Sequence, residues 1–228
     1  KSVDIEEYLD FITYAKECKN QFPTLYDFVA FNAINRLSAG TGYYNYYYDY
    51  YDYYDYYGYG NLNTDRITEQ AYLADAEEFV KFPVEADSLS YSYASIKIYQ
   101  KWIDFRLSDN ENIEAFLFTD IKRLNFVKSK MYAVNKDDLW EAGLVKLHDK
   151  YYKNPELTMI NYELAKYYNQ HGNSYNFLDS AKTHLRLFNR KAITLLDEAI
   201  KLYPNKSYAP ECKNLKTEIE KVSFSFEN

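Results

Sequence analysis

The sequence predicts an all-α protein of antiparallel helical hairpins in a right-handed superhelical array, with a short strand-like tail at its C-terminal end. Three observations predict this class. Apolar residues recur every three or four positions along most of the chain, which is the period of an amphipathic helix. Residues that typically start or stop helices stand at the ends of these stretches. The 228 residues include only 6 Gly and 5 Pro, too few for a turn-rich sandwich.

The N-terminal third predicts three helices, at about residues 2–15, 24–37 and 64–82. Thr24 is placed to cap the second helix, with Asp27 three residues later to complete a capping box. A glycine follows the second helix and a proline follows the third, and both are typical stop signals. The apolar stripe of the first helix comprises Ile5, Tyr8, Leu9, Ile12 and Ala15.

The middle of the chain predicts three further helices. They begin near Ser90, after Asn110 and at Asn135, and the first two carry apolar residues at helical spacing. The helix at about 90–107 carries its apolar residues on one face, and the third helix has two aspartates in its first turn, where they suit the helix dipole.

The C-terminal part predicts three more helices and then a change of period. The Asn-Pro pair at 154–155 is placed as N-cap and first residue of a helix that Gly172 ends. Two others are expected at about 187–203 and 207–221. Residues 223–226 then alternate between polar and apolar, which is typical of a strand. Because one short strand is not stable alone, we interpret it as the start of a β domain.

The region after residue 156 resembles a pair of tetratricopeptide (TPR) helices. Its first helix has the Leu-small-aromatic pattern of that repeat, and its second has two alanines and a closing proline at the repeat's spacing. An insertion at about 170–186 separates the two helices, and a generic helical hairpin is the alternative. The matching positions are Leu164, Ala165, Tyr168, Ala192, Ala199 and Pro204.

We therefore expect three parts and one apolar core. Residues 1–156 form an N-terminal helical region with a Tyr-rich loop at 43–59. Residues 157–222 form a TPR-like hairpin with a capping helix, within a TPR-like superhelical array, and residues 223–228 begin the β domain. The expected core residues are Ile12, Phe28, Ile34, Trp102, Phe116, Ile121, Leu124, Leu164, Ala192 and Ala199.

Composition and charge exclude several classes of function. The chain carries a net charge of −7 at pH 7, which argues against general binding of nucleic acid. No run approaches the ~20 apolar residues of a membrane span, so no membrane-spanning segment is expected. The two cysteines are too few for a disulfide framework or a four-ligand zinc site.

The tyrosine content is the compositional anomaly of this chain. Of 28 tyrosines, 12 lie between residues 43 and 59, interrupted by aspartates and bounded by glycines. Tyrosine offers a large amphipathic contact area at low cost in entropy, so this low-complexity tract is a candidate binding loop. Expansion of a repeat within a tolerant loop is the alternative. The candidate contact residues are Tyr47, Tyr50, Tyr53 and Tyr56.

The residues that could carry chemistry predict no enzyme, no metal site and no cofactor. The three histidines lie far apart in the sequence, and we find neither an HExxH motif nor a Gly-rich phosphate loop nor a GxSxG turn. We interpret each histidine as a surface or helix-end residue. Cys212 is interpreted as a small buried apolar residue.

Five segments stand in a recognisable order and spacing. They are FPTLYDFVAFNAI (22–34), FTDIKRLNFV (118–127), NKDDLWEAGLVKL (135–147), MINYELAKYY (159–168) and KAITLLDEAIKLYPNKSYAPECKNLKTEIEKVSFSFE (191–227). Together they resemble the N-terminal helical region of large bacterial alpha-2-macroglobulin-family proteins. In that family a TPR-like segment ends in a Cys-bearing helix and continues into the first macroglobulin β-sandwich, as Cys212 and residues 223–227 would do here. The tyrosine tract departs from the family pattern.

The resemblance implies an extracytoplasmic protein, located in the periplasm, at the bacterial envelope or outside the cell. It implies a non-catalytic helical scaffold and protein-binding module of a protease inhibitor that traps proteases. The partners would be the downstream macroglobulin β-sandwich domains of the same chain, or another envelope protein or peptide. No catalytic residue is transferred, because the family's bait region and thioester have no counterpart in these residues.

Two other functions are open at this stage. A glycan-binding surface protein, similar to the helical starch-binding outer-membrane lipoproteins, would use the tyrosine tract together with Trp102 and Trp140. A free-standing TPR-like peptide-binding module would instead use a groove between the helices at 157–171 and 187–203. The residues expected to line that groove are Tyr162, Asn169 and Lys191.

Overall fold

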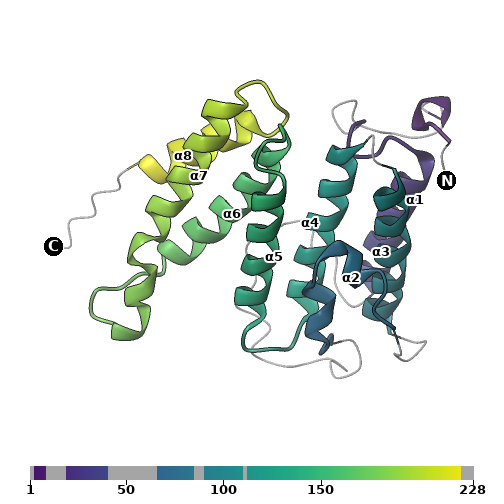
Figure 1. Ribbon diagram of the computed structural model, residues 1–228. Helices are drawn as coiled ribbons and strands as arrows, with labels where there is room; N and C mark the ends of the chain where they lie inside the picture. Colours follow the sequence, from purple (N-terminus) through teal and green to yellow (C-terminus); the bar gives the residue numbers. More distant parts are fainter. Residues whose placement is uncertain (1–2, 9–18, 41–65, 85–89, 110–111, 222–228) are drawn as a thin grey trace. The chain divides into compact units, whose positions relative to one another are not determined.

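The structure of the chain is a computed structural model whose described residues fall into two compact units (Figure 1). The described residues are 3–8, 19–40, 66–84, 90–109 and 112–221. Within them every regular element is a helix, which confirms the all-α class, whereas the superhelical arrangement stays a prediction. The candidate tyrosines of the 43–59 tract and the strand-like tail lie outside the described residues.

The first unit extends to Gly143, and its helix α3 packs against both α1 and α4. The boundary to the second unit lies within α5, earlier than the boundary after residue 156 that the sequence led us to expect. The elements are η1 (Ile5–Tyr8), α1 (Leu25–Gly40), η3 (Gln70–Leu73), α2 (Ala76–Phe79), α3 (Tyr91–Ser108), α4 (Ile113–Lys130) and the N-terminal part of α5 (Lys136–Lys150).

Helices α1 and α3 begin at the caps that the sequence indicates. The backbone nitrogen and the hydroxyl of Thr24 donate to Oδ2 of Asp27 over 2.9 and 2.6 Å, and the backbone nitrogen of Asp27 donates to Oγ1 of Thr24 over 3.4 Å. The Ser90 hydroxyl accepts from the backbone nitrogen of Tyr93 over 3.3 Å. These bonds satisfy N–H groups that have no partner within the helix, so they fix where each helix starts.

The single helix predicted at 64–82 is wrong. The described part of this stretch contains two short helices, η3 and α2, and its start is held by a β-bridge. The backbone nitrogen of Ile67 donates to the Lys130 carbonyl over 3.0 Å, and the Ile67 carbonyl accepts from Tyr132 over 2.9 Å. This pairing with the end of α4 uses backbone groups that a helix would need for itself.

The break between η3 and α2 also has a tertiary cause. Ala74, which follows η3, has an extended backbone, with ψ at 174°. The guanidinium of Arg123 on α4 donates to the carbonyls of Tyr72 and Ala74 over 2.7 and 2.9 Å. Those carbonyls are therefore satisfied by a side chain about 50 residues away instead of by a continuing helix.

The core of the first unit is rich in aromatic rings. The indole of Trp102 is fully buried, and the rings of Phe22 and Tyr99 stack on it with centroid distances of 6.4 and 6.2 Å. Phe28 is half-buried, because Ala30 and Ile34 lie on the face of α1 that packs inward and Phe28 lies beside that face. Ile12 lies outside the described residues. The confirmed core residues are Ile34, Trp102, Phe116, Ile121, Leu124, Leu164, Ala192 and Ala199.

The second unit begins at Leu144 and is a helical hairpin covered by a third helix. Helix α6 packs against both α7 and α8. The predicted start of α6 is two residues too early, because Glu156 is the N-cap and Leu157 the first helical residue. Asn154 instead stabilises the preceding turn, where its Oδ1 accepts from the backbone nitrogen of Glu156 over 2.9 Å. Gly172 ends α6, as predicted. The elements are α6 (Leu157–Gly172), η4 (Ser180–Leu187), α7 (Phe188–Leu202) and α8 (Ala209–Glu220).

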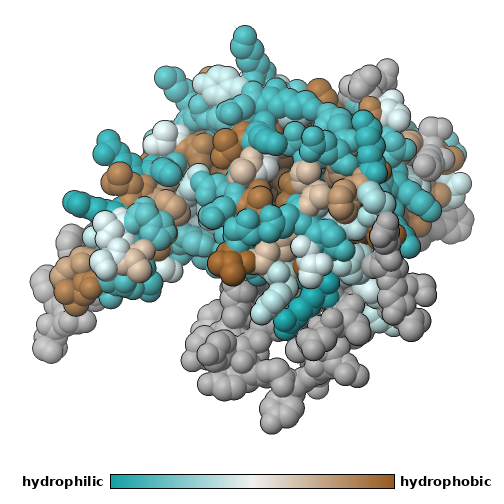
Figure 2. Space-filling model, turned by 60° about the horizontal axis from the view of Figure 1, so that its bottom comes forward, coloured by the Kyte–Doolittle hydropathy of each residue, from teal (hydrophilic) through white to brown (hydrophobic). Residues whose placement is uncertain are grey.

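The described surface is mostly hydrophilic. Figure 2 shows one face, on which brown apolar areas are scattered between hydrophilic ones. The most exposed large apolar side chains are those of Val134, Phe177 and Leu178. Each helix among the described residues is too short or too polar to cross a bilayer.

Candidate functional site

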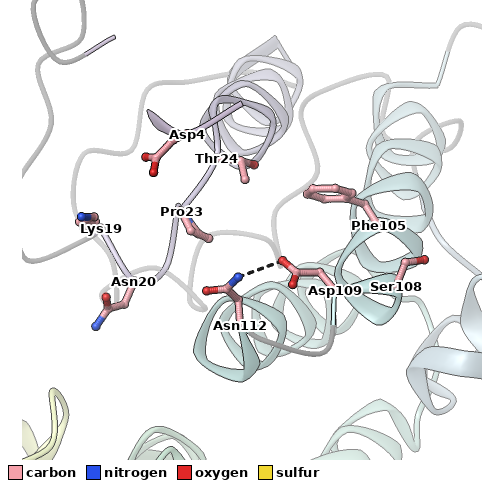
Figure 3. Close-up of a pocket in the computed structure, with 9 residues that line it drawn as sticks. All are labelled: Asp4, Lys19, Asn20, Pro23, Thr24, Phe105, Ser108, Asp109 and Asn112. Atoms are coloured by element: carbon pink, nitrogen blue, oxygen red, sulfur yellow. Dashed lines mark hydrogen bonds between the residues drawn. The ribbon is translucent and has the colours of Figure 1, made fainter. Parts of the chain in front are cut away.

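A pocket of about 550 Å³ lies in the first unit beside the start of α1 (Figure 3). It is formed by the segment before α1, the last turn of α3 and the residue that precedes α4. Seven of its nine lining residues have polar side chains, and the ring of Phe105 projects into it from α3. The lining residues are Asp4, Lys19, Asn20, Pro23, Thr24, Phe105, Ser108, Asp109 and Asn112.

A buried ion pair supports one wall of this pocket. The side chains of Asp27 and Arg106 are fully buried, with Nη2 of Arg106 3.2 Å and Nε 3.0 Å from the two carboxylate oxygens of Asp27. The indole nitrogen of Trp102 donates to the same carboxylate over 2.7 Å. Nη1 of Arg106 then donates to Oδ2 of Asp109 over 2.7 Å. A buried charge is tolerated only with such partners, so this network fixes the Asp109 carboxylate in place.

The pocket offers both donors and acceptors to a small polar molecule. Asp109 also accepts from the side-chain nitrogen of Asn112 over 3.0 Å, the bond drawn as a dashed line in Figure 3. Asn20 contributes an amide donor from the segment before α1, where the neighbouring Lys19 ammonium is paired with Glu6. One face of Phe105 is covered by the guanidinium of Arg106, 4.3 Å from the ring centroid. Sequence reasoning missed this pocket, because its residues come from three separate segments and form no motif.

The two tryptophans proposed as glycan contacts lie inside the first unit. Trp102 is 0% exposed and Trp140 is 3% exposed. The indole nitrogen of Trp140 donates to Oδ1 of Asn125 over 2.8 Å, and Lys128 lies over its ring at 4.3 Å. Because both indoles pack in the core, they are not surface platforms for a sugar, and the core assignment of Trp102 is the one confirmed.

The residues expected to line a peptide groove take separate positions in the second unit. Tyr162 on α6 packs against Tyr208 beside α8, with ring centroids 5.7 Å apart. Lys191 on α7 lies over the Tyr168 ring, 5.1 Å from its centroid. Asn169 is half-buried and its carbonyl accepts from the backbone nitrogen that follows α6. The described contacts do not bring these three side chains together.

A polar cluster connects the last turns of α5 with α6 and α7 in the second unit. Oε2 of Glu198 lies 3.1 Å from Nε2 of His148 and accepts from Nδ2 of Asn161 over 3.0 Å. Burial alone raises the pKa of Glu198, but hydrogen bonds from His148, Asn161 and Tyr152 outweigh it, and the net pKa lies below its ordinary value of 4.5. Sequence reasoning missed this cluster, because His148 and Glu198 are 50 residues apart.

Acidification is expected to destabilise the second unit through Glu198. Because its pKa in the folded chain is lowered, the carboxylate stabilises the fold above pH 4.5, and this contribution is lost as the pH falls through the folded pKa. Glu198→Gln should therefore flatten the fall in the free energy of unfolding below pH 4.5, measured by urea titration with circular dichroism. Glu218→Gln, an exposed site on α8, is the matched control. Equal slopes for wild type and Glu198→Gln would contradict the assignment.

Cys212 is a free thiol inside the second unit. It is fully buried, and its Sγ donates to the Thr158 carbonyl over 3.6 Å. Burial, with a smaller contribution from the charge of nearby Glu211, raises the pKa of this thiol to about 12. These observations confirm the interpretation of Cys212 as a small buried residue.

The folded chain is expected to resist alkylation at Cys212. Iodoacetamide reacts with the thiolate, and a buried thiol with a pKa of about 12 is almost entirely protonated at pH 8. In a Cys18→Ser background, iodoacetamide should label Cys212 only after urea is added, as followed by intact mass. Fast labelling without denaturant would show that the thiol is accessible and would contradict the burial.

Among the described residues, no three side chains of His, Cys, Asp and Glu are grouped as a metal site would require. Comparison of the chain with protein-family models, with curated proteins and with solved structures gave no match. Its function must therefore be inferred from its own residues and their geometry.

Proposed function

We propose that this chain is a non-catalytic helical scaffold and protein-interaction module, the N-terminal helical region of a secreted or envelope alpha-2-macroglobulin-like protease-trapping protein. One observation carries the proposal, namely the close packing of α6 with α7 and α8 through small residues. Ala165, Ala192 and Ala199 are 0% exposed, so the helix backbones approach closely, as they do in tandem helical repeats. Cys212 is buried in α8, the helix in which the resemblance expects a cysteine.

The buried ionisable groups support a structural role. Asp27 and Arg106 are paired with each other, and Arg123 is held by Asp120 and two backbone carbonyls. The thiol of Cys212 is kept protonated by burial. Catalytic groups usually lie in a cleft with a charge state poised for reaction, whereas these groups hold helices together.

The gene gives the first test of this proposal. Beyond the codon of Asn228, a long open frame with repeated β-sandwich patterns would support it. A prompt stop codon would contradict it and leave the free-standing peptide-binding module as the better interpretation. The scaffold role is then tested by mixing the chain with the adjoining β-sandwich, which should raise the Tm of the chain through binding to its folded state. An unrelated β-sandwich domain is the control and should leave the Tm unchanged.

Glycan binding is a second candidate function, and the pocket beside α1 favours it. The carboxylates and amides of the lining can hydrogen-bond to the hydroxyls of a sugar, and the Phe105 ring can contact its apolar face. Ser108→Trp should fill the pocket from its exposed rim and abolish binding to a saccharide array. Ser129→Trp, an exposed site on α4, is the matched control. Loss of binding only when residues 43–59 are deleted would instead place the site in the tyrosine tract.

A further inference from the structure

The segment at 173–187 connects α6 to α7, and its two ends lie close together (Figure 1). The side-chain nitrogen of Asn189 donates to Oδ1 of Asn173 over 3.1 Å. Gly172 lies so close to α7 that a Cβ there would be 2.9 Å from the backbone nitrogen of Asn189. Only a residue without a side chain fits this contact, so the base of the segment is fixed by the packing of the two helices.

Within this segment one apolar residue packs inward and several face water. Leu185 is 7% exposed and anchors the short helix η4. By contrast, Phe177 is 80% exposed, Leu178 is 78% exposed and Leu187 is 57% exposed. Adjacent apolar side chains at this level of exposure are costly in water, and grouped apolar side chains on a surface typically mark a contact site.

The same stretch carries a surplus of positive charge. Residues 173–191 contain four Lys or Arg side chains and a single acidic one, Asp179. All four cations are exposed, and Lys182 has Asp179 at 3.9 Å. Among the described residues, Arg186 and Arg190 have no ion-pair partner. These charges are therefore available to an external anionic partner.

We propose that the 173–187 segment, together with Arg190 and Lys191, docks the chain peripherally on an anionic lipid bilayer. Phe177 and Leu178 enter the interface between headgroups and acyl chains, while the cations contact lipid phosphates. A bilayer is favoured over a protein partner because these two side chains protrude, and a fluid surface receives protruding groups without a complementary pocket. The inference goes beyond the scaffold function proposed above and does not depend on it.

Vesicle co-sedimentation of the full chain tests this docking. Wild type should bind vesicles of equimolar phosphatidylcholine and phosphatidylglycerol, bind pure phosphatidylcholine far more weakly, and release with added salt. Phe177→Ser with Leu178→Ser should weaken binding by at least about tenfold. Arg186→Glu with Arg190→Glu should do the same. The matched controls, Val134→Ser for the apolar pair and Lys201→Glu with Lys213→Glu for the charges, should bind as wild type does.

Insertion of the segment can be read directly by fluorescence. The native tryptophans are buried, so Phe177→Trp adds a reporter whose emission should shift to the blue with the mixed vesicles, whereas Val134→Trp should not shift. Equal binding by wild type and the Phe177/Leu178 variant would overturn the proposal. The proposal would also be overturned, in favour of a contact with a second copy, if wild type failed to bind vesicles but self-associated and the Phe177/Leu178 variant did not.

Discussion

Replacing Asp27 by alanine is expected to cost about 3–5 kcal/mol of the free energy of unfolding of the first unit. The substitution leaves the guanidinium of Arg106 buried without its carboxylate, because both side chains are 0% exposed. It also removes the acceptor for the Trp102 indole and for the hydroxyl of Thr24 at the start of α1. Arg106 would keep only its bond to the partly exposed Asp109, and a buried charge that loses its buried partner is among the few single changes that cost so much.

Tryptophan fluorescence in a urea titration measures this loss selectively. Trp102 and Trp140 both lie in the first unit, so their emission reports on that unit. Asp104→Ala removes an exposed carboxylate from α3 and serves as the control, with an expected change within about 0.5 kcal/mol. A loss below about 1 kcal/mol for Asp27→Ala would mean that the ion pair is hydrated, and would contradict the buried network.

Replacing Arg123 by leucine is expected to destabilise the first unit by a similar amount, about 3–5 kcal/mol. Arg123 donates to Oδ1 of Asp120 from Nε over 2.9 Å and from Nη2 over 2.6 Å, and Asp120 is 1% exposed. The same guanidinium satisfies the carbonyls of Tyr72 and Ala74. Leucine therefore removes the Arg123 donors from a buried carboxylate, from the buried carbonyl of Tyr72 and from the half-buried carbonyl of Ala74.

A double-mutant cycle separates the ion pair from the carbonyl contacts. Asp120→Asn in the Arg123→Leu background removes the buried negative charge of the Asp120 carboxylate, and it should recover part of the lost stability. Arg123→Lys keeps the charge but loses the planar fork, so an intermediate loss is expected. Limited proteolysis between residues 66 and 84 should increase in the leucine variant, because Arg123 holds the carbonyls that end η3. If the leucine variant resisted the protease as well as wild type does, that role of Arg123 would be contradicted.

Local signals were sufficient for most helices of this chain. The cap at Thr24, the serine at position 90 and the stop at Gly172 mark the ends of helices that the structure contains. Such signals are short-range, since a capping side chain reaches only its own first turn. The prediction for residues 64–82 was wrong because partners distant in the sequence, Arg123 and the end of α4, satisfy backbone groups of this stretch.

The candidate site was less accessible to sequence reasoning. Asp27 was recognised as part of a capping box, but its ion pair with Arg106 joins residues 79 positions apart. Trp102 was assigned to the core and also offered as a sugar platform, and burial decided between the two. The pocket beside α1 and the cluster around Glu198 are both built from distant segments, so neither had a local pattern to reveal it.

The sequence by itself determined the helical class, the caps and the small residues between α6 and α7, because each depends on periodicity or on neighbours within one or two turns. Tertiary structure alone decided which polar groups are buried and paired. It also decided that Phe177 and Leu178 face water while Leu185 faces inward. The physical reason is that burial and ion pairing depend on which distant elements pack together. In this chain a few buried charged side chains, such as Arg106 and Arg123, stabilise those contacts.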